Sequence, residues 1–141
     1  MAGKVAQATG GELYAITPAE SYTSADLDWN DKQSRSSVEM SDPASRPAIG
    51  GEALNADGYD VIFLGYPVWW NLAPRIVNTF VESHDLNGKT VIPFATSGSS
   101  GITNSAAALK KTYPDIDWKE GKLLNRASAG DIREWVGKLG Y

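Results

Sequence analysis

The chain has 141 residues, a length that suits one domain over residues 1–141 and hardly two. Its formal net charge of −4 gives no basic surface for nucleic acid, and it contains no run of 18 apolar residues that could span a membrane. The N-terminus lacks the apolar core of a signal peptide, so the expected compartment is the cytoplasm. With no cysteine and one histidine, the sequence excludes disulfides, thiolate chemistry, iron–sulfur clusters and multi-histidine metal sites. Redox chemistry would need a bound cofactor.

The first 57 residues are predicted to contain little regular structure. Residues 3–9 have the pattern of a helix end, and residues 12–16 that of a short strand. Residues 19–57 are rich in Ser, Asp, Asn and Pro, which is typical of a long irregular excursion, with a helical turn near 34–40. We interpret Trp29 as an anchor that packs this excursion on the domain rather than as a lid over a ligand. Four embedded side chains predict an ordered excursion: Tyr22, Leu27, Trp29 and Met40.

The rest of the chain alternates strands with helices. Residues 59–65 and 89–95 are continuous apolar runs, which predict strands buried on both faces, as in a parallel sheet. The alternation predicts right-handed β-α-β crossovers and a mostly parallel sheet. Helices are predicted at 74–82, at 104–111 and from the cap Ser128 onward, and one more strand is predicted at 118–124.

Two loops follow the buried strands, where ligands bind in parallel sheets. Tyr66–Leu72 carries the adjacent indoles of Trp69 and Trp70, and a flat conjugated ligand would cover surface that is otherwise exposed. In the alternative, one indole packs on the helix that begins at Pro74 and the other covers the excursion. Thr96–Gly101 offers hydroxyls, backbone N–H groups and glycines that could contact the polar edge of a heterocycle, or it is an ordinary capped turn.

Other kinds of site fit the sequence less well. Thr96–Gly101 lacks the second glycine of a nucleophile elbow, and no dinucleotide or P-loop glycine motif occurs. His84 is expected at the opposite end of the sheet, as a surface or capping residue. The acidic residues of the excursion are too dispersed for a cation site and should be solvated or paired with Arg35 and Arg46. These acidic residues are Asp26, Asp28, Asp31, Glu39 and Asp42.

Three segments resemble bacterial flavodoxin-like proteins: the run from Tyr59 to Trp70, the loop from Phe94 to Gly101, and the strand from Trp118 to Leu124. The subgroup with a long insert like Ser34–Met40 after its second strand is the most similar. The resemblance covers essentially the whole chain. It implies an α/β fold, a flavodoxin-like three-layer sandwich with a mostly parallel sheet.

The resemblance also implies non-covalently bound FMN, used for electron transfer or quinone-type reduction with a redox partner protein or a small quinone-like substrate. It implies no metal and no catalytic side chain. By position, the isoalloxazine ring would contact Tyr66, Pro67, Val68, Trp69, Trp70 and Asn71. Its polar edge would contact Thr96, Ser97, Gly98, Ser99 and Gly101.

One part of the family pattern has no counterpart in the sequence, namely a first, central strand with the phosphate-binding loop that follows it. Residues 1–10 correspond to the second half of the next helix, so the chain is expected to be N-terminally truncated relative to the family. The segments at Glu12 and Tyr59 would then close up, a second protomer would fill the gap, or another segment would be recruited. An exposed sheet edge favours a homo-oligomer. The alternative function is a non-catalytic apo domain, stabilised by oligomerisation, that does not hold FMN.

Overall fold

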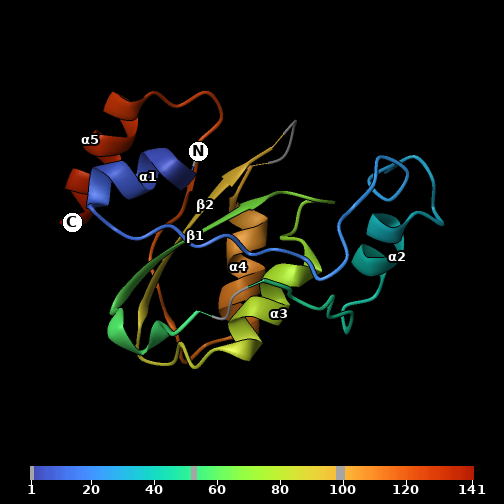
Figure 1. Cartoon of the computed structure of the whole chain (residues 1–141). Helices are drawn as coiled ribbons and strands as arrows, with labels where there is room; N and C mark the ends of the chain where they lie inside the picture. Colours follow the sequence, from blue (N-terminus) through green and yellow to red (C-terminus); the bar gives the residue numbers. More distant parts are fainter. Residues whose placement is uncertain (1, 52–53, 98–100) are drawn as a thin grey trace.

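The computed structural model describes residues 2–51, 54–97 and 101–141. They form three layers, a parallel sheet with helices on each of its faces (Figure 1). Strand β1 (Val61–Pro67) pairs with β2 (Thr90–Thr96) from Val61 opposite Thr90 to Pro67 opposite Thr96. The short strands β3 (Asp117–Trp118) and β4 (Lys122–Leu123) both pair with β2, also in parallel. The predicted strand at 118–124 is therefore split in two. The predicted α/β class is confirmed.

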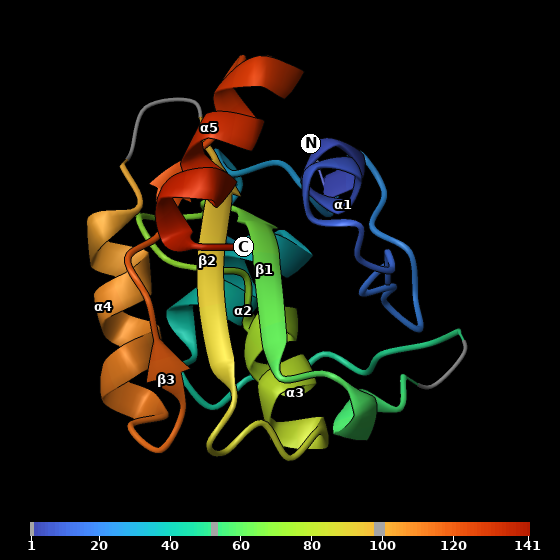
Figure 2. The same ribbon diagram turned by 90° about the vertical axis from the view of Figure 1, so that its left-hand side faces the viewer.

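Helices cover both faces of the sheet (Figures 1 and 2). One face carries α1 (Ala2–Thr9) and α5 (Ala129–Leu139), and the other carries α3 (Arg75–Ser83) and α4 (Thr103–Thr112). The excursion contains α2 (Arg35–Ser41) and is followed by a 3-10 turn, Ala56–Gly58. No helix of the described ranges is long and apolar enough to cross a membrane.

Local sequence explains where the helices begin and end. Pro74 precedes α3, a position that needs no N–H donor, and the helix turns Val77 and Phe80 into the core. The α5 helix begins with a capping box, in which the Ser128 side chain accepts from the backbone of Asp131 and the Asp131 side chain accepts from the backbone of Ser128.

The two long strands differ in burial although their apolar runs look alike. Between Val91 and Ala95 every residue of β2 is buried, whereas Val61, Ile62 and Phe63 of β1 are half-buried. Within the described residues, β1 has a ladder partner on one side only. The prediction that both runs are buried on both faces is therefore right for β2 and wrong for the first half of β1.

Among the residues that the structure describes, the segment at 12–16 joins no ladder, so the strand predicted there is wrong. Its side chains still alternate as in a strand. Tyr14 and Ile16 are half-buried, and Tyr14 lies on the Phe80 ring of α3 with ring centroids 6.0 Å apart. Leu13 and Ala15 are exposed.

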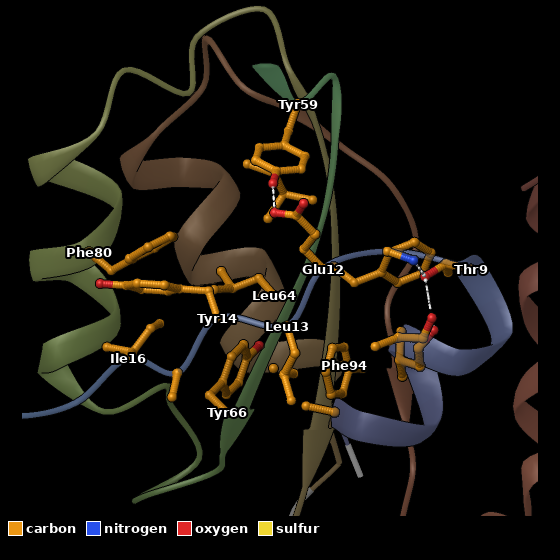
Figure 3. Close-up of a pocket in the computed structure, with 18 of the residues that line it drawn as sticks. Thr9, Glu12, Leu13, Tyr14, Ile16, Tyr59, Leu64, Tyr66, Phe80 and Phe94 are labelled. Atoms are coloured by element: carbon orange, nitrogen blue, oxygen red, sulfur yellow. Dashed lines mark hydrogen bonds between the residues drawn. The ribbon is translucent and has the colours of Figure 1, made fainter. Parts of the chain in front are cut away.

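A groove separates this extended segment from β1 (Figure 3). Its volume is about 910 Å³, and its lining runs from Tyr59 at one end of β1 to Thr96 near the other. Near the Tyr59 end, the tyrosine hydroxyl donates a hydrogen bond to the Glu12 carboxylate (Figure 3). Of the three alternatives, direct closure of the segments at Glu12 and Tyr59 is not what the structure shows, since residues of both segments line the groove between them.

The excursion is ordered, as predicted, but through polar contacts. Tyr22 donates to Glu39 of α2, which also forms an ion pair with Arg35 at 3.0 Å, and the Arg35 guanidinium lies 3.8 Å from the centre of the Tyr22 ring. Burial, and the hydrogen bond to Glu39, raise the pKa of Tyr22. Arg75 of α3 donates to the backbone oxygen of Met40 at 2.9 Å and so fastens the excursion to the domain.

The interpretation of Trp29 as a packing anchor is wrong. Its side chain is 70% exposed, and Leu27 is exposed as well, whereas Met40 is buried. Turns capped by local Asp and Thr side chains hold this part of the excursion, so its order does not depend on burying the indole.

Replacing Gly65 with alanine should lower the free energy of unfolding by about 1–3 kcal/mol, because a Cβ there would collide with the Phe94 ring of β2. Gly137 of α5 is the matched control. A Cβ at Gly137 meets nothing within 4 Å, so Gly137→Ala should stabilise the protein by about 0.5–1 kcal/mol through helix propensity. Urea denaturation measures both. Equal shifts of the same sign would contradict the close approach of Phe94 to β1.

Candidate functional site at the carboxyl ends of β1 and β2

The loop after β1 folds into a tight turn. The backbone N–H of Trp69 donates to the Leu72 oxygen at 2.8 Å, and the N–H of Leu72 donates back at 2.9 Å. Between them, Trp70 and Asn71 have φ angles of 47° and 63°. Positive φ at both central residues is typical of a type I′ turn.

Trp70 occupies an unusual position in this turn. Asparagine tolerates the left-handed region, but a bulky side chain rarely adopts it, and strain of this kind collects at functional sites. The Trp70 side chain is 48% exposed. The fold thus holds a large flat ring at the sheet edge without burying it in the core.

The other two aromatic residues of the predicted ring site have partners within the protein. Tyr66 is only 5% exposed, its hydroxyl lies 3.0 Å from the Ser105 hydroxyl of α4, and burial raises its pKa. Trp69 is half-buried and makes an edge contact with Tyr22 of the excursion, with ring centroids 5.6 Å apart. The structure therefore places Tyr66 in the core and Trp69 against the excursion, and it leaves Trp70 open to solvent.

The loop after β2 is clamped to the strand next to it. The backbone N–H of Ser97 donates to the Asn125 side-chain oxygen at 2.8 Å, and the Asn125 amide donates to the Ser97 oxygen at 2.5 Å. Thr96 is exposed, as is Gly101. The predicted site residues Gly98 and Ser99 lie outside the described residues.

One contact joins the two loops, and a second ties the first loop to helix α4, which follows the second loop. The N–H of Val68 donates to the Thr96 oxygen at 2.9 Å, which extends the β1–β2 ladder by one step. The Asn104 amide, on α4, donates to the Asn71 oxygen at 3.1 Å. The structure thus brings together the described parts of both predicted loops, and the exposed Pro67 lies between them in β1.

The sequence-based prediction missed Asn104 and Asn125. Asn125 lies two residues after β4, so the rule that functional residues follow strands would have pointed to it. Asn104 lies in the first turn of α4 and carries no comparable signal. His84, in contrast, ends α3 and has a ring nitrogen 2.8 Å from the Phe80 backbone oxygen, which agrees with the predicted capping role.

A flat heterocycle fits the chemistry of these loops, because an exposed indole provides a stacking surface and the clamped second loop provides polar groups beside it. The groove reaches the same edge, since Pro67 and Thr96 line its end. Comparison with known proteins identifies the family. The family model of flavodoxin matches residues 1–139. The chain belongs to the flavodoxin family.

Two solved Bacteroides structures are similar over nearly the whole chain of this flavodoxin-family protein. A candidate flavoprotein from Bacteroides eggerthii is 62% identical, with a TM-score of 0.94, over 99% of this chain and 87% of that chain. A candidate flavoprotein from Bacteroides uniformis is 56% identical, with a TM-score of 0.93, over 96% and 86%. These matches confirm the predicted flavodoxin-like fold.

A third structure is a flavoprotein in complex with FMN from Lactobacillus acidophilus. It is 15% identical, with a TM-score of 0.59, over 81% of this chain and 75% of that chain. At this identity the likeness concerns the fold. No curated protein matches the chain.

Replacing Asn71 with valine should destabilise the protein by about 1–2 kcal/mol, because a β-branched residue is strained in the left-handed region. Asn71→Gly is the matched control and should be nearly neutral, since its backbone adopts this φ freely. Urea denaturation separates the two. A valine variant as stable as the glycine variant would show that the turn at Trp70 does not hold this conformation in solution.

Proposed function

We propose that this flavodoxin-family chain is an FMN-binding redox protein whose ring site lies at the carboxyl ends of β1 and β2. The exposed, backbone-strained Trp70 carries this proposal, because a flat conjugated ring is the partner that such an indole lacks. The flavoprotein names of the relatives and the FMN complex in the distant structure support it.

On this proposal, the two loops contact different parts of the flavin. The Trp70 indole would hold the isoalloxazine ring by stacking and would shield it from water. Thr96 and Ser97 would lie beside its polar edge, where backbone groups can bind the heteroatoms, and Asn125 holds Ser97 in place for this. FMN supplies the electron chemistry when it is bound, and the protein orients and tunes it.

The partner is either a redox protein or a small quinone-like substrate. The β1–β2 edge leaves Trp70, Asn71 and Thr96 exposed, so an acceptor can approach the ring from solvent. The protein would act as an oxidoreductase if a small substrate is turned over there, and as an electron carrier if a protein docks.

A second candidate function is a non-catalytic apo domain that is stabilised by self-association. The half-buried β1 favours it, because an unpaired edge over an apolar groove templates pairing with another chain. A homo-oligomer of this kind would not need the cofactor.

Titration of the purified chain with FMN should quench flavin fluorescence at tens of micromolar, since stacking against an indole provides a quenching partner. Trp70→Ala should weaken binding roughly tenfold, the loss expected from one stacking contact. Trp29→Ala is the matched control, because Trp29 is also exposed but lies in the excursion, and it should leave the titration unchanged.

The same titration tests the assigned ring site and decides between the two candidate functions. Quenching that is lost in both variants, or in neither, would contradict the assigned ring site. No quenching by the unmodified chain, together with an oligomer in light scattering, would favour the apo domain.

A further inference from the structure

The excursion with α2 lies beyond the carboxyl end of β1 (Figure 1). It meets the turn of the proposed ring site at an aromatic contact, where Tyr22 lies edge-on to Trp69 with ring centroids 5.6 Å apart and an interplanar angle of 78°. We propose that Tyr22 is a positioning residue of this site, which acts through Trp69 to hold the turn that presents Trp70. The inference rests on the proposed function, since the flavin is the ring that Trp70 would then meet.

The turn needs support from outside itself. Trp70 and Asn71 have φ angles of 47° and 63°, and a bulky residue in this region persists only where the surrounding structure holds it. The Trp70 side chain supplies little of that support, because it is 48% exposed. Hydrogen bonds between the backbones of Trp69 and Leu72 close the turn, so a contact that fixes Trp69 also restrains the backbone at Trp70.

Each neighbour of Trp70 is held by a residue from another element. On one side, the Trp69 ring meets the Tyr22 ring of the excursion. On the other side, the Asn71 backbone oxygen accepts from the Asn104 amide of α4 at 3.1 Å. The strained residue therefore lies between two external contacts, one aromatic and one polar, which is the support that such a backbone conformation requires.

The Tyr22 ring is itself fixed at its hydroxyl and at one face. The hydroxyl donates to the buried Glu39 carboxylate, and the Arg35 guanidinium lies 3.8 Å from the ring centre. Arg35 and Glu39 also pair with each other at 3.0 Å. Burial and the hydrogen bond to Glu39 raise the pKa of Tyr22, so the phenol stays protonated and remains a donor at neutral pH. A ring held in this way presents its edge to Trp69 in a defined orientation.

The same network is tied to the segment that follows the turn. Arg75, three residues after Leu72, donates to the backbone oxygens of Glu39 at 3.3 Å and of Met40 at 2.9 Å. The stretch from Trp69 to Arg75 is therefore joined to the excursion at both of its ends. Tyr22 thus belongs to a unit that is anchored beside the turn and does not hang from it.

The contact between Tyr22 and Trp69 can be removed without opening the core. Both rings are half-buried, whereas core side chains such as Leu64 and Phe80 are only 3% exposed. Tyr22→Leu removes the aromatic edge and the hydroxyl together. Tyr22→Phe is the matched control, because it removes the same hydroxyl but keeps the edge that meets Trp69. A difference between the two variants therefore reports the ring contact and not the hydrogen bond to Glu39.

Hydrogen–deuterium exchange of the full chain without flavin tests the contact. The amides of Trp69 and Leu72, which donate within the turn, should exchange about fivefold faster in Tyr22→Leu than in the unmodified chain, the ratio expected from one aromatic pair. In Tyr22→Phe they should change by less than about twofold. The amides of Thr90 and Lys119 are internal controls, because their hydrogen bonds lie at the opposite end of β2 and should not change.

Two exchange results would overturn the positioning role. Equal acceleration in Tyr22→Leu and Tyr22→Phe would assign the effect to the hydroxyl and not to the ring contact. Equal acceleration at Thr90, Lys119 and the turn would show that Tyr22 stabilises the whole fold and does not act on the turn in particular.

Flavin titration of the same variants tests whether the ligand depends on this support. Tyr22→Leu should weaken FMN binding about fivefold and Tyr22→Phe by less than about twofold, because a turn that opens more often presents the Trp70 indole for less of the time. An unchanged affinity in Tyr22→Leu, alongside faster exchange in the turn, would overturn the role of Tyr22 in binding.

The two measurements separate this inference from the proposed function. An unmodified chain that does not quench flavin fluorescence would contradict the proposed function, and the exchange contrast would still decide whether Tyr22 holds the turn. Quenching by the unmodified chain without any exchange contrast would have the opposite meaning. It would retain the ring site and overturn the assignment of Tyr22.

Discussion

The parallel ladder between β1 and β2 is the interaction on which the rest of the structure depends. It places the ends of two strands side by side, so the turn at Trp70 and the loop at Ser97 lie next to each other. The same ladder satisfies only one edge of β1. Within the described residues β1 is an edge strand of the sheet, and its unpaired side faces the groove, which leaves Phe63 half-buried.

The sequence predicted the elements whose signals are local. Continuous apolar runs identified β1 and β2, and caps and helical spacing identified α3, α4 and α5. The strand predicted at 12–16 is wrong for a physical reason. Alternation and composition describe the side-chain pattern of a strand, but a ladder needs a neighbouring strand, which no local signal reports. The burial of β1 was overestimated for the same reason, because an apolar run shows what a strand can bury and not what lies next to it.

Within the candidate site, topology was predictable and side-chain roles were not. The rule that ligands bind after parallel strands located both loops. It could not tell that Tyr66 turns into the core toward Ser105, since that depends on its place in the alternation of β1. Nor could it tell that Trp70 takes a positive φ, because Asn71 signals a turn but not its type. Trp29 was misjudged because burial was inferred from residue type, whereas the excursion is held by Arg35, Glu39 and Arg75.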